Sequence, residues 1–326
     1  MEPWHEKSGK KLEGGQSRRG FMRQVSTLTV VAASADVARG QANAAPPDPD
    51  ALPNLLPTSQ VGPHRITKLI LGGNPIYGHS HFNRLYSQHL RDYHTTQRVV
   101  QLLRDSVNAG VNTWQNSYTM RTVSDVLRCR DEGIPFHWLL LGKGDWVRDP
   151  SIIETAATYK PDGISPHGSS SERLHREGNL KLLRDMLKRI RQTGALVGLS
   201  AHNPEVIEIA EDQGWDVDYY MCCAYYHNRP ESEFKELLGE VPLGELYLRS
   251  DRERMMKIVK NASKPCLVYK VLAAGREVLT SRGIHNAFKF ALDNMKQNDA
   301  MIVGMFQEFG DQVKMNARIV RELCNT

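Results

Sequence analysis

The chain has 326 residues, of which 40% are hydrophobic and 24% charged, with 42 lysines and arginines against 37 aspartates and glutamates. Outside residues 1–44 the count is 35 basic against 33 acidic residues, too even for the clustered positive charge that binds nucleic acids or membrane surfaces. We therefore expect neither a nucleic-acid partner nor a stable membrane anchor, and the length suits one α/β barrel domain.

Residues 1–44 have the features of a cleavable export leader. Arg18 and Arg19 precede Phe21, a mildly apolar run over 25–35, and the small residues of Ala42-Asn43-Ala44. The apolar core of about ten residues is well short of the roughly 20 that span a bilayer. The pattern is typical of a twin-arginine signal peptide, with a disordered basic tail as the alternative. It predicts the twin-arginine export machinery as a partner and a periplasmic or otherwise exported protein.

Residues 45–63 are rich in Pro, Asn and Asp and lack an apolar period, so we expect a flexible tether before a barrel domain over 64–326. In that domain short apolar runs alternate with helical segments eight times. The predicted strands are Ile66–Leu71, Thr113–Asn116, Trp138–Leu141, Gly163–Ser165, Leu196–Ser200, Tyr219–Ala224, Pro265–Val271 and Ala300–Met305.

The intervening segments have helical periodicity. Leu183, Met186, Leu187 and Ile190, for example, recur at three and four residues before Gly194. Eight strand–helix units predict a single-domain (βα)8 barrel, the TIM barrel. The alternative, an open doubly wound sheet, normally has a Gly-rich phosphate turn after its first strand, and Gly72-Gly73-Asn74-Pro75 lacks that spacing.

Because a (βα)8 barrel has its active site at the carboxyl ends of its strands, polar residues there are the site candidates. They are Asn74, His79, Lys143, His167, Ser200, His202, Asn203, Tyr225, Lys270 and Arg276. Each has an alternative role. His202 could cap the next helix, and a mouth lysine could pair with a carboxylate at the rim, or lose its proton and form a Schiff base. Cys222 and Cys223 are expected to pack, and no cysteine spacing predicts a metal site.

The domain resembles the aldo/keto reductases, a nicotinamide-dependent barrel family. The segments that carry the resemblance are Gly110–Trp114, Leu140–Lys143, Pro166-His167, Gly198–Ser200 and Val303–Met305, followed by Asp311 and Asn316. The resemblance implies that Lys143 tunes a proton donor, that His167 orients substrate, and that Gly304 and Asn316 belong to the cofactor site. Gln115 and Met120 stand where the family has Asp and Tyr, so Tyr118 is the candidate acid, and Ala201 replaces the family's Asn.

The chain is also similar to an uncharacterised group of exported barrels with three shared motifs: Gly72–Pro75, His202–Pro204 and Lys270–Arg276. Three functions remain open. The first is an oxidoreductase that acts on a small carbonyl or sugar with NADP or NAD, using Tyr118, Lys143 and His167. The second is a cofactor-free or metal-assisted lyase or isomerase on a sugar-like substrate, using His167, His202 and Lys270, with a divalent metal as its candidate cofactor. The third is a noncatalytic binding protein.

Overall fold

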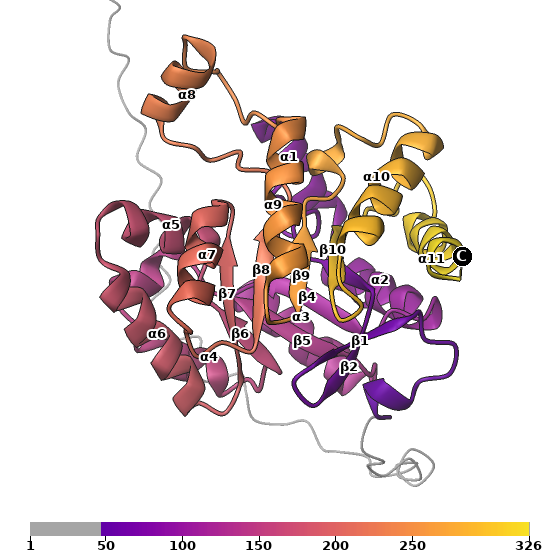
Figure 1. Ribbon diagram of the computed structural model, residues 1–326. Coiled ribbons are helices and arrows are strands. Elements are labelled where there is room, and N and C mark those ends of the chain that lie inside the picture. Colours follow the sequence, from indigo (N-terminus) through magenta and orange to yellow (C-terminus); the bar gives the residue numbers. More distant parts are fainter. Residues whose placement is uncertain (1–46, 326) are drawn as a thin grey trace, which may run out of the picture. The chain divides into compact units, whose positions relative to one another are not determined.

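The structure is a computed structural model that describes residues 47–325 (Figure 1). Eight parallel strands close into a barrel in the order β10-β3-β4-β5-β6-β7-β8-β9. They are β3 (Leu69–Gly72), β4 (Thr113–Ser117), β5 (His137–Leu141), β6 (Gly163–Ser165), β7 (Leu196–Ala201), β8 (Tyr219–Cys223), β9 (Cys266–Tyr269) and β10 (Ala300–Gly304). The prediction of a single α/β barrel is confirmed. The predicted export leader lies outside the described residues.

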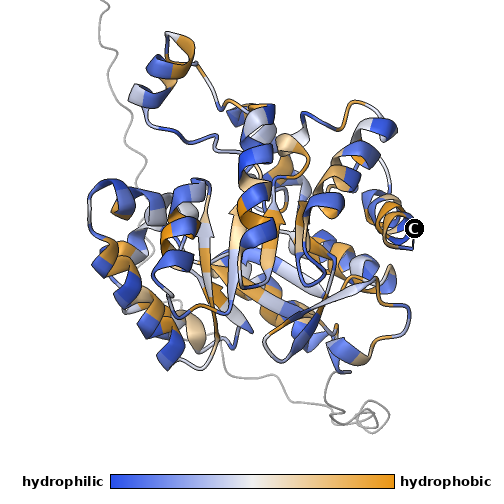
Figure 2. Ribbon diagram, in the orientation of Figure 1, coloured by the Kyte–Doolittle hydropathy of each residue, from blue (hydrophilic) through white to orange (hydrophobic). Residues whose placement is uncertain are grey.

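Helices cover the outside of the barrel and turn their apolar sides toward the strands (Figure 2). The buried side chains of α6 are Leu183, Met186, Leu187 and Ile190, as its periodicity predicts. No helix within residues 47–325 has the length and apolarity needed to cross a bilayer. The helices are α1 (Arg84–Tyr93), α2 (Thr96–Asn108), α3 (Met120–Asp131), α4 (Ile152–Ala157), α5 (Gly168–Arg176), α6 (Leu180–Gln192), α7 (Pro204–Asp212), α8 (Glu231–Leu238), α9 (Arg249–Asn261), α10 (Ser281–Asn294) and α11 (Gln312–Cys324), with short 3₁₀ turns η2 (Pro49–Ala51), η3 (Gly144–Val147) and η4 (Ala273–Gly275).

Seven of the predicted strands agree with the structure to within two residues at each end. The first does not, because the segment predicted as Ile66–Leu71 is divided between β2 (His64–Thr67) and β3. The break lies at Lys68, whose backbone N–H donates to the carbonyl of Pro57 on the hairpin side, at 2.7 Å, while its carbonyl accepts from Met301 of the barrel, also at 2.7 Å. The sequence does not reveal this break, because apolar residues lie on both sides of Lys68 and such a run predicts one strand.

The C-terminal part of the expected tether, residues 58–63, is ordered. β1 (Thr58–Val61) pairs antiparallel with β2, and the buried Val61 and Ile66 of this hairpin pack with Ile70, Tyr219 and other residues of the barrel interior. In Figure 1 the hairpin lies at the lower end of the barrel, away from the strand tips. Residues 58–63 therefore close the barrel floor, and composition misses this because one or two apolar side chains suffice to fill the opening.

A polar cluster fastens this segment to the barrel floor. Asp50 accepts a hydrogen bond from Nε2 of His137 at 2.8 Å, while Nδ1 of His137 and Nε2 of His64 each lie 3.6 Å from Oδ1 of Asp162. Burial by itself lowers the pKa of His137, but its hydrogen bonds to Asp162 and Asp50 outweigh burial, and its pKa is raised. Burial and the charge of His137 lower the pKa of His64, and they outweigh the nearby carboxylates, Asp48 among them, which raise it.

We expect Asp50→Asn to lower the free energy of unfolding by about 1.5 kcal/mol at pH 5.5, because it removes a hydrogen bond to a charged imidazole. A raised folded-state pKa means that the charged His137 stabilises the fold below its unfolded pKa, and that this contribution disappears as pH rises through the folded pKa. The cost of Asp50→Asn should therefore be smaller at pH 8.5. Urea unfolding of both proteins at the two pH values measures it, and an equal cost at both would contradict a charged His137.

Candidate active site

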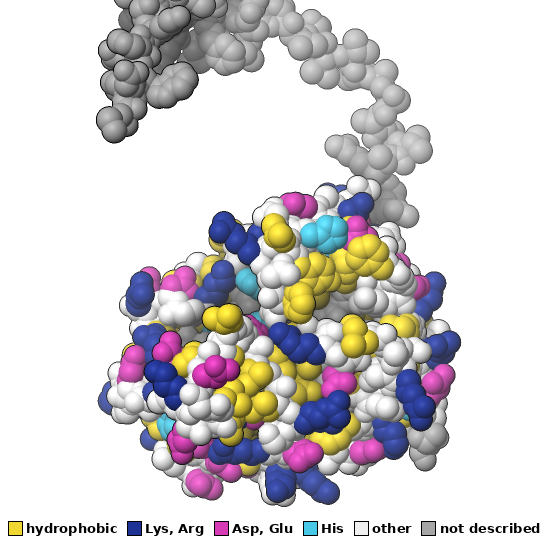
Figure 3. All heavy atoms as spheres, turned by 90° about the horizontal axis from the view of Figure 1, so that it is seen from above, with side chains coloured by type: hydrophobic (Ala, Val, Ile, Leu, Met, Phe, Trp, Pro, Cys, Tyr) yellow, Lys and Arg dark blue, Asp and Glu magenta, His cyan; other side chains and the backbone are white. Residues whose placement is uncertain are grey.

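A cavity of about 450 Å³ opens at the carboxyl ends of the strands. Seen from this side in Figure 3, the surface is hollowed and hydrophobic side chains gather around the hollow. At its edge the exposed Phe309 contacts the buried Phe306, with ring centroids 5.5 Å apart. Its polar lining residues are Asn74, His79, Ser80, His81, Gln115, Tyr269, Lys270, Asp311, Gln312 and Asn316.

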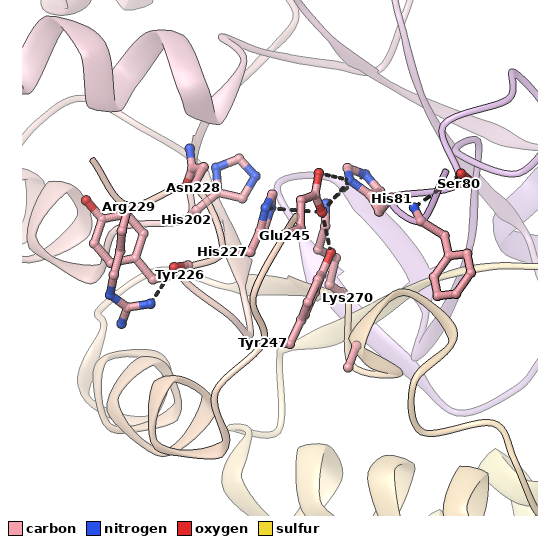
Figure 4. A network of polar contacts seen from close by, with 12 residues as sticks. Ser80, His81, His202, Tyr226, His227, Asn228, Arg229, Glu245, Tyr247 and Lys270 are labelled. Carbon is pink, nitrogen blue, oxygen red and sulfur yellow. Dashed lines mark hydrogen bonds and ion pairs between the residues drawn. The ribbon is translucent and has the colours of Figure 1, made fainter. Parts of the chain in front are cut away.

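A chain of three ionisable side chains crosses the wall of this cavity. Nζ of Lys270 lies 3.1 Å from Nε2 of His81, and Nδ1 of His81 lies 2.8 Å from Oε1 of Glu245 (Figure 4). The carboxylate can only accept, so the proton of a neutral His81 belongs on Nδ1, and Nε2 accepts from Lys270. Burial lowers the pKa of both His81 and Lys270. The pKa of Glu245 falls to about 2, because hydrogen bonding to His81 outweighs burial.

The backbone holds both members of the central pair in the left-handed region. Lys270 has φ 60° and His81 has φ 54°. Lys270 directly follows β9, so this conformation sets the direction in which its side chain leaves the strand. His81 comes from the loop between β3 and α1, and Glu245 from the segment between α8 and α9. Three segments distant in sequence therefore meet at one point of the wall.

A second polar cluster lies beside the first. Glu172, on α5, is fully buried, and its Oε1 lies 3.0 Å from Nδ1 of His202 and accepts the backbone N–H of Asn203 at 2.9 Å. The backbone N–H of His202 and Nδ2 of Asn228 also donate to this carboxylate. Burial raises the pKa of Glu172, but these contacts, led by His202, outweigh it, and the pKa is lowered. The charged carboxylate is thus fully paired and fixes the His202 ring.

His227 and His167 flank His202. The ring centroid of His227 lies 4.7 Å from that of His202, and the centroid of His167 lies 6.4 Å from it. Burial, followed by the charge of Lys270, lowers the pKa of His227 to about 2. Burial, followed by His202, lowers the pKa of His167 to about 4. Both imidazoles are therefore neutral near pH 7 and available as acceptors or ligands.

Two groups of described residues are spaced to hold a metal ion, with all ligand atoms of each group within 4.8 Å of one another. One is His202, Cys223 and His227 at the strand tips. The other, at the barrel floor, is Asp50, His64 and His137. The sequence predicted neither group, and Cys223 in particular was expected only to pack. Cys222 does pack among the core residues outside the barrel, whereas Cys223, its neighbour on the strand, joins the histidines.

The structure separates the predicted site residues into three sets. Asn74, His79, Lys270, Gly304 and Asn316 line the cavity. His167, Ser200, His202 and Asn203 belong to the histidine cluster next to it, where Ser200 contacts Tyr269 and Asn203 caps α7. Arg276 contacts the backbone carbonyls of His81 and Glu245 at the rim, and Tyr225 is buried with its ring 5.3 Å from that of Tyr247.

Tyr118 and Lys143 belong to neither cluster, although Lys143, after burial and His81, helps to lower the pKa of His79 on the cavity wall. The Tyr118 ring packs 5.7 Å from that of Trp146, and Lys143 precedes η3. In the described part of the chain no hydrogen bond or ion pair joins either of them to His167. Glu172 and Glu245 are the residues of these clusters that the strand-end rule does not reach, whereas His81, His227 and Gln115 follow barrel strands but are not among the chosen candidates. The carboxylates come from a helix and a long loop, so no strand-end rule finds them.

The chain matches no protein-family model and no curated protein sequence. Solved structures are similar to it in fold. A truncated 3-deoxy-D-arabino-heptulosonate 7-phosphate synthase of Thermotoga maritima has a TM-score of 0.51 at 12% identity, covering 82% of this chain and 92% of that one. A phospho-2-dehydro-3-deoxyheptonate aldolase of the same organism has 0.49 at 13%, covering 84% and 76%. Gox0644 in its apo form has 0.47 at 12%, covering 81% and 93%. At these identities the likeness shows the barrel fold alone.

The expected membership of the aldo/keto reductases is wrong. No family model supports it or the group of exported barrels, and the similar structure with a TM-score of 0.51 is a 3-deoxy-D-arabino-heptulosonate 7-phosphate synthase. The predicted nicotinamide cofactor and oxidoreductase activity fall with it. The residues agree, because Tyr118, the proposed acid, packs against Trp146 away from the cavity. Short motifs at strand ends reflect barrel geometry, which unrelated activities share.

Proposed function

We propose that the protein is a lyase or isomerase that acts on a sugar-like carbonyl compound by moving a proton from the carbon next to the carbonyl. The observation that carries the proposal is the 3.1 Å contact between Lys270 and His81 on the cavity wall, made by two residues whose backbones are both left-handed. Each such non-glycine conformation costs about 1 kcal/mol or more. Two residues in this costly conformation contact each other here, which favours a functional role for the pair over a purely structural one.

The two side chains suit the two halves of an enolisation. The ammonium of Lys270 can donate to the carbonyl oxygen and stabilise the negative charge that develops there. Neutral His81, with Nδ1–H donated to Glu245, holds its Nε2 lone pair toward Lys270 and Asn74, each 3.1 Å away. When the substrate carbonyl takes the Lys270 hydrogen bond, this lone pair becomes the base that accepts the carbon-bound proton. Glu245 then stabilises the imidazolium that forms. In an isomerase, the protonated His81 returns the proton to a different carbon of the enolate. In a lyase, the enolate first expels the group on the next carbon, and His81 then gives its proton to that leaving group.

The lining of the cavity favours an unphosphorylated substrate. Among the described residues that line it there is no arginine, and Lys270 is the one lysine. The N-terminus of α11, which also reaches the cavity, is already capped by Asp311, whose Oδ1 accepts the N–H of Lys314 at 3.0 Å. The outer wall is apolar, with Leu90 and Ile284 among its members. The Asn74 amide donates to Nε2 of His81 at 3.1 Å, and the amide groups of Gln115 and Asn316 are left to contact hydroxyl groups.

The proposal is tested by proton exchange in heavy water. Purified protein is incubated in D₂O with unphosphorylated hexoses, pentoses and sugar-derived 2-keto acids, and with their phosphorylated counterparts, while proton NMR follows the signal next to the carbonyl. We expect exchange, and new carbonyl products, with an unphosphorylated compound and without added nicotinamide. His81→Gln should slow exchange by about 100-fold, because glutamine cannot accept the proton.

The matched control is His285→Gln on α10, which lies outside both clusters and should exchange at the wild-type rate. If folded wild-type protein exchanges no proton on any member of the panel, the proposed reaction is excluded. If His81→Gln and His285→Gln exchange equally fast, the base has been assigned to the wrong residue.

A further inference from the structure

We infer that His202, Cys223 and His227 form a zinc-type metal site at the strand tips, behind the wall of the cavity. His202 directly follows β7 and Cys223 ends β8, which are neighbouring strands paired through Ala201 and Cys222. His227 follows β8 by four residues. One ligand atom of each residue lies within 4.8 Å of the others, so a single ion could contact all three after small rotations.

The state of His202 is that of a metal ligand. Its Nδ1 lies 3.0 Å from Glu172, so the proton belongs on Nδ1 and Nε2 carries a free lone pair. A metal-binding histidine ordinarily donates its other ring N–H to a carboxylate or carbonyl, which fixes the ring and makes the ligand more basic. Glu172 is a positioning residue of this kind, since its carboxylate is fully buried and held by backbone N–H groups.

His227 provides the second, independent observation. Its side chain is buried, at 8% exposure for the residue, and neither ring nitrogen has a hydrogen-bond partner. Oε2 of Glu245 lies 3.4 Å from Nδ1, within ion-pair range but without hydrogen-bond geometry (Figure 4). Leaving a buried polar group unsatisfied costs about 1–3 kcal/mol. A cation bound by one ring nitrogen would remove that cost and let Glu245 pair with the other.

The donor set selects the class of ion. Two imidazole nitrogens and a thiolate suit Zn²⁺, and disfavour Mg²⁺ and Ca²⁺, which prefer oxygen. Three protein ligands leave a fourth position, as in catalytic zinc sites, where water or a substrate oxygen binds. In the floor group, by contrast, His137 already contacts Asp50 and Asp162 through its two nitrogens. That group is satisfied without an ion, and it serves as an internal control.

The site is tested by metal content, which does not depend on whether the proposed reaction is found. Full-length protein is stripped with a chelator, dialysed against Zn²⁺ or Co²⁺, and analysed by mass spectrometry of the metal and by absorbance. We expect one ion per chain and, with Co²⁺, a thiolate-to-cobalt charge-transfer band. Cys223→Ser should abolish the band, and Glu172→Gln should weaken Zn²⁺ binding by about 10- to 100-fold.

Two matched variants complete the design. Cys222→Ser changes the neighbouring thiol, which packs outside the barrel, and should keep both the stoichiometry and the band. Asp50→Asn changes the floor group and should also keep them. The site is refuted if folded wild-type protein binds no Zn²⁺ or shows no thiolate band with Co²⁺. It is equally refuted if Cys222→Ser loses the band while folded Cys223→Ser retains it. The wild-type band decides the matter even if Cys223→Ser does not fold.

Discussion

Lys270→Met should lower turnover on the substrate found by proton exchange by about 100-fold or more, because it removes the one cation that can stabilise an oxyanion at the cavity wall. Its Nζ has a defined partner, Nε2 of His81 at 3.1 Å. Burial lowers the pKa of Lys270, and a hydrogen bond from a poorly hydrated ammonium to a developing oxyanion is stronger than the same bond in water. Methionine keeps the length and the apolar stem of lysine but donates no hydrogen bond.

Stability separates this effect from a structural one. Methionine at position 270 avoids the cost of burying an ammonium, so the free energy of unfolding should change by less than about 1 kcal/mol. Lys143→Met is the matched control, since Lys143 is also a lysine after a barrel strand but lies outside the cavity lining. Activity and urea unfolding of the three proteins measure both quantities. Equal turnover of Lys270→Met and wild type would remove Lys270 from the mechanism.

Gly198→Ala should lower the free energy of unfolding by about 3 kcal/mol and the melting temperature by about 6–12 °C. A Cβ at Gly198 would lie 2.0 Å from Oγ of Ser165 and 2.4 Å from Cζ of Tyr219. These two side chains are fully buried and hydrogen-bonded to each other at 3.0 Å inside the barrel, so neither can move without losing that bond or opening the packing.

Gly244→Ala is the corresponding control, because a Cβ there would meet nothing within 4 Å. Calorimetry or urea unfolding of both variants gives the comparison, and Gly244→Ala should stay within about 0.5 kcal/mol of wild type. A Gly198→Ala protein as stable as Gly244→Ala would mean that the barrel interior is not packed as tightly as the distances between Gly198, Ser165 and Tyr219 indicate.

The barrel could be predicted because its signal is local. Each strand is a short apolar run followed by a helix with one apolar face, and burying eight such units leaves few arrangements. The strand-end rule also places Lys270 and His202 on one face, because the ends of parallel strands meet on one face of a barrel. The roles of Tyr118, Lys143 and His167 came from the family resemblance, and the Tyr118 ring packs on Trp146.

The sequence by itself determined the fold and the face that carries the site, because hydrophobic periodicity acts over a few residues and applies to every unit of the barrel. Only the tertiary structure decided which side chains contact the residues at the strand ends. Glu172 reaches His202 from a helix, and Glu245 reaches His81 from a loop 164 residues away in sequence. Such contacts depend on how helices and loops pack over the strand tips and on left-handed conformations at Lys270 and His81. These are properties of the closed barrel, and no window of sequence contains them.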